Sequence, residues 1–374
     1  MDKKRIVIKI GSSSLTSLHG ELSRRKIEKI VDEVVRLKDD GHEVLLVSSG
    51  AVAAGYRKLG FINRPKSLPE IQAAASIGQG LLIETYSDLF ISHGYVGSQI
   101  LITRDDFKYE TRYNNARSTL TVLLERGIIP IVNENDTITM DFLKFGDNDT
   151  LSAKVAGLVN ADQLIILSDI DGLFDDDPRK NEDAKLLDQV HVITPDIEAA
   201  AGDPGSSLGT GGMKSKIEAF KISLASGIPA FLGKANSDNI IYDAVNREAK
   251  GTYFEPKEDN ENLNQKKQWI AFNSGPEGEV TIDDKVKASI QEGNTGLAPT
   301  DLHSVKGRFD KGAVVRIKDL NGKKIGLGVM KYSSKELKKL IENKVEDQLK
   351  NYKVAAVESE DLVCHLNAAV PAGV

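Results

Sequence analysis

Three glycines and two lysines stand directly before a helical pattern in LGTGGMKSKIEAF, residues 208–220. Glycines let a backbone turn tightly with its N–H groups facing one point, and a helix N-terminus adds partial positive charge there. Lys214 and Lys216 add full charges, so the stretch could hold a phosphate or another anion. It is not a P-loop, because Lys214 stands where that motif needs its second glycine. The alternative is a loop that only caps the helix.

Two further segments join a strand to a turn of small residues. In IKIGSSS, Lys9 lies in a run that should be buried, where its charge needs an anion. The alternative is an edge-strand lysine that points to water. In VSSGAVAAG, Ser49 and Gly50 end a strand and open a helix, which suits a small polar ligand. Tight helix packing through alanine and glycine is the alternative there.

Acidic and amide side chains follow three other runs. NENDTI contains Asp136, which could bind an amine, although turn formation explains this motif more simply. FGDNDTLSAKVAGLV contains Asn148 and Asp149, and its polar run exceeds what a helix N-cap needs. Such carboxylates could position lysines or a metal ion near phosphates. ILSDIDGLFDDDPR contains Ser168 and Asp169; its glycine spacing excludes a calcium loop and indicates a turn beside a nucleotide.

Alternating strands and helices must position these residues. Short β-type runs alternate with helical patterns over residues 1–254, which predicts an α/β fold: an open, mainly parallel sheet sandwiched by helices. Ligands bind at the carboxyl ends of strands in such sheets, and the candidate residues follow the strand ends. This pattern suits phosphoryl transfer, which depends mainly on positioning and positive charge. The expected strands are residues 5–10, 43–50, 96–103, 128–133, 162–169 and 228–233.

A change of composition indicates a second domain. The segment EPKEDNENLNQKKQ is polar and charged, as linkers are. Three β-type runs and a helical pattern follow it, and this part has an excess of Lys and Arg, whereas the N-terminal part has an excess of Asp and Glu. We expect a catalytic domain at 1–256, a linker at 257–274, a small mixed β domain at 275–363 and a tail at 364–374.

Composition excludes several classes of protein. A formal net charge of -6 does not favour nucleic-acid binding by the chain as a whole. One cysteine excludes an internal disulfide framework and a cysteine-rich metal site. The N-terminus has no long apolar region, and no apolar run approaches the ~18 residues of a membrane span. We therefore expect a cytoplasmic protein without membrane contact.

The motifs together resemble the amino acid kinase family. KIGSSSLT, VSSGAVAAG, VNENDTI, FGDNDTLSAKVA, LSDIDGLF and GTGGMKSK occur in that family's order and approximate spacing. GDND combined with GTGGM is typical of its glutamate-phosphorylating members, and the C-terminal runs are similar to a PUA domain, so the resemblance covers essentially the whole chain. It implies ATP-dependent phosphorylation of the L-glutamate γ-carboxylate, the first step of proline synthesis from glutamate.

The resemblance also implies a role for each site residue. Lys9 and Lys216 would contact the transferring phosphoryl group, and Asp149 would hold the two lysines in place. Mg²⁺ would accompany ATP and bridge phosphate oxygens, with no protein residue assigned to the metal. L-glutamate would be bound by Ser49, Asp136 and Asn148. ATP would be bound by Lys9, Ser168, Asp169, Thr210, Gly211, Gly212, Met213, Lys214, Ser215 and Lys216, with Ser215 where the family more often has threonine.

The family further implies partners, and rival functions stay open. A homo-oligomer, dimer or tetramer, is expected, with proline as a feedback inhibitor, glutamyl phosphate reductase as the next enzyme, and RNA as a candidate ligand of the PUA-like domain. Related kinases of aspartate, N-acetylglutamate, carbamate or UMP are the nearest rivals. An RNA-binding protein that acts through its basic C-terminal domain is the rival from another class. A catalytically inactive regulator is disfavoured by the intact set of Lys9, Asp149 and Lys216.

Overall fold

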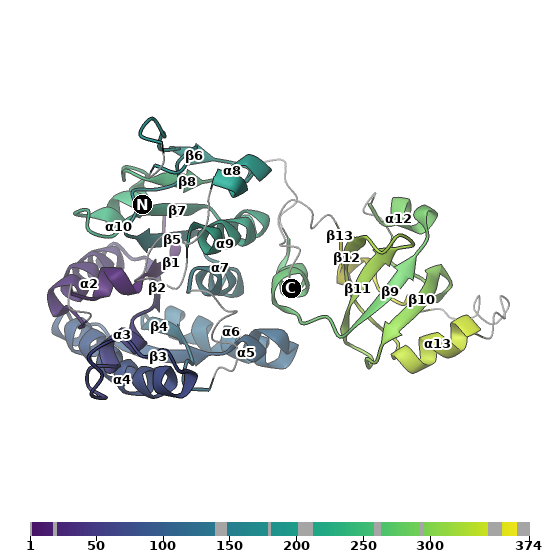
Figure 1. Cartoon of the computed structure of the whole chain (residues 1–374), viewed down its shortest axis with the longest axis horizontal. Helices are drawn as coiled ribbons and strands as arrows, with labels where there is room; N and C mark the ends of the chain where they lie inside the picture. Colours follow the sequence, from purple (N-terminus) through teal and green to yellow (C-terminus); the bar gives the residue numbers. More distant parts are fainter. Residues whose placement is uncertain are drawn as a thin grey trace. The chain divides into compact units, whose positions relative to one another are not determined.

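The structure, a computed structural model, divides into two compact units (Figure 1). One unit comprises Met1–Asp106 and Thr111–Asn262, and the other comprises Phe107–Glu110 and Leu263–Val374. Each unit has its own sheet and its own apolar core. The structure describes residues 2–17, 21–138, 148–178, 181–200, 212–257, 263–291, 295–342 and 354–364.

An eight-stranded sheet forms the centre of the N-terminal unit, in the order β3-β4-β2-β1-β5-β7-β8-β6. Every neighbouring pair is parallel except β7 and β8, which confirms the expected open, mainly parallel sheet. The short strands β6 and β8 were not expected, because two or three residues carry no readable periodicity. The strands are β1 (Arg5–Ile10), β2 (Glu43–Ser48), β3 (Gly97–Ile102), β4 (Ile129–Glu134), β5 (Gln163–Ser168), β6 (Gln189–Val190), β7 (Ala230–Lys234) and β8 (Thr252–Phe254).

Helices cover both faces of this sheet, with α2, α4 and α10 on one side and α7 and α9 on the other (Figure 1). The first three bury apolar side chains against β1, β2 and β5 in one core, which includes Ile27, Val34 and Phe90. The helices are α1 (Ser12–Leu15), α2 (Arg24–Asp39), α3 (Ala51–Gly55), α4 (Leu68–Ser92), α5 (Arg104–Lys108), α6 (Glu110–Glu125), α7 (Asn148–Leu158), α8 (Pro195–Ala200), α9 (Met213–Ala225) and α10 (Ile240–Asn246).

Two glycines let α3 and α4 cross in direct backbone contact. A Cβ atom on Gly78 of α4 would lie 1.8 Å from the carbonyl oxygen of Ala51, and one on Gly55 of α3 would lie 1.9 Å from that of Ala74. Interiors packed this closely leave no space for an added methyl group. The helix-packing interpretation of VSSGAVAAG is therefore confirmed, and the crossing fixes the chain directly after β2.

The C-terminal unit is a mixed β domain, as expected. Its sheet has the order β10-β9-β11-β12-β13, antiparallel except for the parallel pair of β9 and β11. The strands are β9 (Gly278–Ile282), β10 (Leu302–Gly307), β11 (Val314–Asp319), β12 (Lys324–Val329) and β13 (Leu362–Cys364). The helical elements are α11 (Gln265–Gln268), η1 (Trp269–Asn273), α12 (Asp284–Gln291), η2 (Pro299–Asp301), α13 (Ser334–Glu342) and η3 (Ser359–Asp361).

Helical structure begins inside the segment expected to be a linker. The Asn264 side chain accepts a hydrogen bond from the N–H of Lys267 at 2.9 Å and so caps α11. The indole N–H of Trp269 donates to the carbonyl oxygen of Phe107 at 3.0 Å, which joins two separate stretches of the same unit. The expected tail lies outside the described residues from residue 365 onward.

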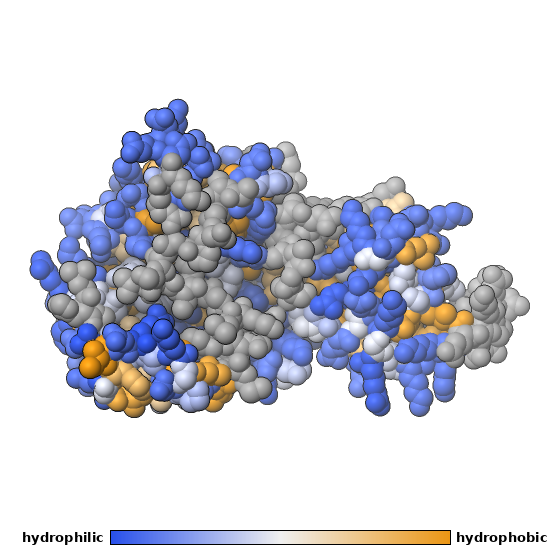
Figure 2. Space-filling view, viewed as in Figure 1, coloured by the Kyte–Doolittle hydropathy of each residue, from blue (hydrophilic) through white to orange (hydrophobic). Residues whose placement is uncertain are grey.

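Outside the grey areas, the surface of the N-terminal unit in this view is mostly hydrophilic (Figure 2). An apolar area lies at its lower left edge, in the region of α3 and α4. Exposed apolar side chains on α4 and just before it include Leu59, Ile62 and Ile77, and Ile62 is 84% exposed. Within the described ranges, no helix has both the length and the apolar character of a membrane span.

We predict that Gly78→Ala lowers the free energy of unfolding of the N-terminal unit by about 3 kcal/mol or more, because the new methyl group must push α4 away from α3. Urea unfolding followed by circular dichroism measures this change. Gly80→Ala on the same helix is the matched control, since a Cβ there meets no atom within 4 Å. It should stabilise the unit by roughly 0.5–1 kcal/mol through helix propensity. Equal effects of the two substitutions would refute the steric explanation.

Candidate active site

Lys9 is buried in the middle of the large sheet. Its strand, β1, lies between β2 and β5, and a central parallel strand is covered on both faces. Only 2% of Lys9 is exposed, so the alternative of an edge-strand lysine that points to water is wrong. A buried ammonium group requires a partner of opposite charge.

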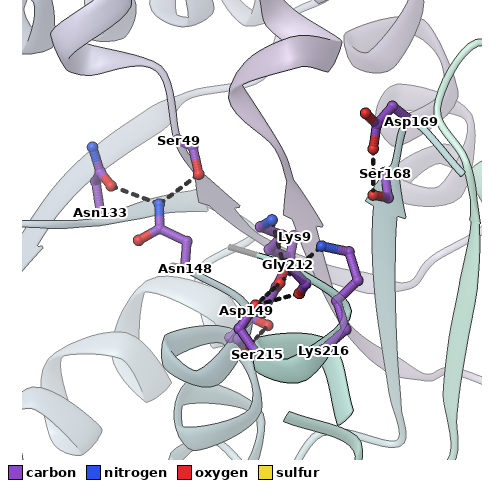
Figure 3. Close-up of polar contacts among 11 residues, drawn as sticks. Lys9, Ser49, Asn133, Asn148, Asp149, Ser168, Asp169, Gly212, Ser215 and Lys216 are labelled. Carbon is purple, nitrogen blue, oxygen red and sulfur yellow. Dashed lines mark hydrogen bonds and ion pairs between the residues drawn. The ribbon is translucent and has the colours of Figure 1, made fainter. Parts of the chain in front are cut away.

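Asp149 is that partner, and it also binds a second lysine (Figure 3). The Lys9 Nζ atom lies 2.6 Å from Asp149 Oδ1, and the Lys216 Nζ atom lies 3.1 Å from Asp149 Oδ2. Asp149 stands in the first turn of α7, and Lys216 in the first turn of α9. The three side chains come from opposite halves of the unit and are all buried.

Ser215 also contacts this carboxylate. Its Oγ atom donates to Asp149 Oδ2 at 2.9 Å and also lies 2.9 Å from the carbonyl oxygen of Gly212. Gly212 precedes α9, which begins at Met213, and Lys214 is exposed beside them. The first turn of α9 therefore presents Lys216 and Ser215 to the same carboxylate. Thr210 and Gly211, which the sequence places in the same loop, lie outside the described residues.

The geometry brings two buried ammonium groups to one carboxylate. Asp149 thereby orients Lys9 and Lys216 toward the same place. Positive groups held in a buried site in this way can stabilise negative charge on a phosphoryl group.

A second polar group lies beside the first, at the ends of β2 and β4 (Figure 3). The Asn148 Nδ2 atom donates to Ser49 Oγ at 2.9 Å and to Asn133 Oδ1 at 2.9 Å. Gly50 adopts a φ of 106°, which glycine tolerates best, and this turn from β2 into α3 places Ser49 at the strand end. The group offers a hydroxyl and amide groups to a small polar ligand.

Asn133 was not assigned to the site from the sequence, although it lies in the NENDTI motif. It is the fifth residue of β4 and is buried, with 2% exposed. The sequence did contain a signal for Asn133, because it is the one polar residue in the run IIPIVN, residues 128–133. Turn formation also accounts for an asparagine at this position, because asparagine commonly favours turns.

The remaining candidates lie around these two groups. Ser168 ends β5, next to β1, and its Oγ atom donates to Asp169 Oδ1 at 3.1 Å. Asp136 follows β4 in a half-buried turn, where burial raises its pKa to about 6 against the opposing charge of Arg64. In the described part of the chain, no hydrogen bond joins Asp136 to Ser49 or Asn148.

Family models match both units. The model of the amino acid kinase family matches residues 4–234, and that of the PUA domain matches residues 278–352. The chain belongs to the amino acid kinase family.

Full-length relatives narrow this assignment. Glutamate 5-kinase 2 of Bacillus licheniformis is 60% identical over 370 residues, which cover 99% of each chain. Glutamate 5-kinase 2 of Bacillus subtilis is 61% identical over 368 residues, 98% of each chain. The carbamate kinase from Giardia lamblia bound to AMP-PNP is a solved structure with 15% identity and a TM-score of 0.49, covering 68% of this chain and 99% of its own. Within its family, the chain groups with the glutamate 5-kinases.

We predict that Asp149→Asn lowers the free energy of unfolding by about 3–5 kcal/mol, because it removes the buried negative charge that two buried lysines contact. Urea unfolding of the full chain measures the loss. Asp238→Asn is the matched control: Asp238 pairs with Lys29 at 3.2 Å, but the carboxylate is 85% exposed. Such surface pairs contribute little to stability. A small effect of Asp149→Asn, similar to that of the control, would mean that the buried pairs are not required for folding.

Proposed function

We propose that this chain transfers the γ-phosphoryl group of ATP directly to the γ-carboxylate of L-glutamate, giving L-glutamyl 5-phosphate and ADP. The observation that carries the proposal is the convergence of Lys9 and Lys216 on the buried carboxylate of Asp149. The substrate follows from the names and the high identity of the full-length relatives. This reaction is the first step in the synthesis of proline from glutamate.

The proposed chemistry requires charge stabilisation rather than a general base. A glutamate γ-carboxylate has an ordinary pKa of about 4.3, so it is ionised and nucleophilic at neutral pH. It would attack the γ-phosphorus in line with the leaving oxygen of ADP, while negative charge spreads over the phosphoryl oxygens. Lys9 and Lys216 would contact these oxygens, and Asp149 would hold both ammonium groups in position.

The polar side chains at the ends of β2 and β4 are proposed to bind L-glutamate. Ser49 and Asn148 are already joined by a hydrogen bond and lie on the side of Asp149 toward β2 and β4. Asp136 supplies a carboxylate for the α-ammonium group of the substrate. The neighbouring positions of Asn148 and Asp149 in α7 would then bring the substrate to the phosphoryl group.

The opposite side of Asp149 is proposed to bind ATP. Ser168 and Asp169 at the end of β5 would line the nucleotide site, together with Lys9 and the loop from Thr210 to Lys216. Among the described residues, no group of three carboxylate, histidine or cysteine side chains could hold a metal ion. Both oxygens of Asp149 are occupied by Lys9, Lys216 and Ser215. Mg²⁺ would therefore take its ligands mainly from ATP phosphates and water and add charge compensation there.

The proposal extends to domains and partners. Residues 1–256 would form the catalytic domain, 257–274 the linker and 275–363 the PUA-like domain. Exposed apolar side chains such as Ile62 and Ile77 support a homo-oligomer. Proline as feedback inhibitor, glutamyl phosphate reductase as the next enzyme, and RNA as a ligand of the basic C-terminal domain remain proposals, as does a cytoplasmic location.

Trapping the acyl phosphate tests the reaction directly. Purified protein would be incubated with ATP, Mg²⁺, L-glutamate and hydroxylamine, with L-aspartate, N-acetylglutamate and UMP as alternative acceptors. We expect a hydroxamate from L-glutamate alone. Consumption of ATP with another acceptor instead would retain the phosphoryl-transfer site and reject the substrate.

We predict that Lys216→Met lowers kcat by on the order of a hundredfold or more, because the variant keeps the apolar stem and loses the charge that stabilises the phosphoryl group. Initial rates at saturating ATP and glutamate measure kcat. Lys221→Met on the same helix is the control, since Lys221 pairs with Glu198 at 2.6 Å and takes no part in the proposed site. Turnover close to that of the unaltered protein would exclude Lys216 from the transfer step.

We predict that KM for L-glutamate falls as the pH rises from 5 to 7. Burial raises the pKa of Asp136 to about 6, so its carboxylate becomes ionised, and able to bind an ammonium group, only within this range. KM for ATP should not follow the same profile. Asp136→Asn should give a higher KM for glutamate with no inflection near pH 6. An inflection that persists in this variant would assign the titration to another group.

A further inference from the structure

A chain of buried side-chain hydrogen bonds leads from α4 to the proposed glutamate site. The Asn133 Nδ2 atom donates to Gln79 Oε1 at 2.8 Å, and the Asn148 Nδ2 atom donates to Asn133 Oδ1 at 2.9 Å. Gln79, Asn133 and Asn148 are each at most 8% exposed. Gln79 comes from the middle of α4, a helix that contains none of the residues assigned to the site so far.

The backbone N–H of Glu134 fixes which atoms donate and which accept in this series of side-chain hydrogen bonds. The N–H of Glu134 donates to Asn133 Oδ1 at 2.9 Å, and a backbone N–H can only donate. The Oδ1 atom of Asn133 must therefore face β4 and Asn148, and its Nδ2 atom must face Gln79. Gln79 in turn must present its Oε1 atom as the acceptor.

The same logic sets the orientation of Asn148. Its Nδ2 atom donates to Asn133 and to Ser49, so its Oδ1 atom is directed away from both. An amide oxygen accepts hydrogen bonds and suits an ammonium group. If the Asn148 amide were reversed, its NH₂ group would meet the ammonium group of an amino acid, and the two donors would repel.

We propose that Gln79 is a positioning residue that acts through Asn133 to hold the Oδ1 atom of Asn148 toward the α-ammonium group of the substrate. This inference rests on the proposed function, because the substrate is taken to be an amino acid. Gln79 itself does not touch the substrate in this proposal. It stabilises the orientation of Asn133 that the Glu134 N–H selects, and through Asn133 the orientation of the Asn148 amide.

The position of Gln79 is fixed by the helix crossing beside it. Gly78, the preceding residue, lies against the backbone of Ala51 in α3, so the two helices pack without a gap and α4 cannot move closer to α3. Seven residues further along α4, on the same side of the helix, the buried hydroxyl of Tyr86 lies 3.1 Å from Ser48 Oγ at the end of β2. The carboxamide of Gln79 is thus a rigid reference for Asn133.

Stability alone does not explain a glutamine at this position. Its Nε2 atom is buried and has no hydrogen-bond acceptor within the described part of the chain. A buried donor without an acceptor costs free energy, and an apolar side chain of similar length would avoid that cost. The amide oxygen of Gln79 supplies the hydrogen-bond acceptor for Asn133, which an apolar side chain could not provide.

The test compares three variants of the full-length protein, with substitutions at two positions of α4. Gln79→Met keeps the length and removes the acceptor, so KM for L-glutamate should rise on the order of tenfold while KM for ATP stays within about twofold. Gln79→Glu retains an acceptor oxygen and should restore most of the glutamate affinity. Tyr86→Phe is the control. It removes a buried hydrogen bond of the same helix and leaves the hydrogen bonds among Gln79, Asn133 and Asn148 intact. It should leave KM for glutamate unchanged.

A double-mutant cycle separates positioning from a general loss of structure. Once Asn148 is replaced by alanine, Gln79→Met should raise KM for glutamate little further, because no amide remains to be oriented. Additive effects of the two substitutions would overturn the proposal. So would an increase in KM for glutamate in Tyr86→Phe equal to that in Gln79→Met.

A readout independent of catalysis distinguishes failure of this proposal from failure of the proposed function. In protein labelled with ¹⁵N-asparagine, the side-chain NH₂ signals of Asn133 and Asn148, assigned by substitution, should shift in Gln79→Met and not in Tyr86→Phe. Unshifted signals in Gln79→Met overturn the positioning role. Shifted signals with unchanged KM for glutamate also overturn it. If the unaltered protein makes no hydroxamate from glutamate, the proposed function fails, while these signals still decide whether Gln79 orients Asn148.

Discussion

The ion pairs that Asp149 makes with Lys9 and Lys216 are the interaction on which the rest of the site depends. Burying three charged groups is costly, and the cost is offset only when the geometry is close and further hydrogen bonds assist, as Ser215 does. That geometry requires β1 in the centre of the sheet and α7 and α9 meeting at one end of it. The fold therefore holds two ammonium groups next to each other at one buried carboxylate.

The first turn of α7 connects the two halves of the site. Asn148 and Asp149 are consecutive, and consecutive helical residues point about 100° apart, so one turn can serve two directions. Asn148 contacts Ser49 and Asn133 toward β2 and β4, whereas Asp149 contacts the lysines of β1 and α9. A small shift of α7 would disturb both groups together. In the proposed function, this turn would link the binding of the acceptor to the positioning of the phosphoryl group.

Support for the site reaches well beyond the residues that face a ligand. The glycine contact of α3 with α4 fixes the end of β2 and the helix that carries Gln79. Gln79 and Asn133 in turn restrict the amide of Asn148 to one orientation. Rigid elements hold functional groups more accurately than loops do, and Gln79, Asn133 and Asn148 all lie on helices or strands. The hydrogen-bond directions follow from a single backbone N–H, that of Glu134.

The sequence alone determined the fold class, the strands long enough to show a pattern, and the motifs at their carboxyl ends, because hydrophobic periodicity and turn chemistry are local properties. It did not reveal β6 or β8, whose two or three residues form strands only beside longer neighbours. It left the environment of Lys9 open, because an edge strand and a central strand can share one pattern. The family resemblance implied that Asp149 holds Lys9, although local patterns could not show it, and only the tertiary structure joined Gln79 to Asn133. These contacts link residues 140 and 54 positions apart, whose neighbourhood depends on the order of the strands and the crossing of the helices.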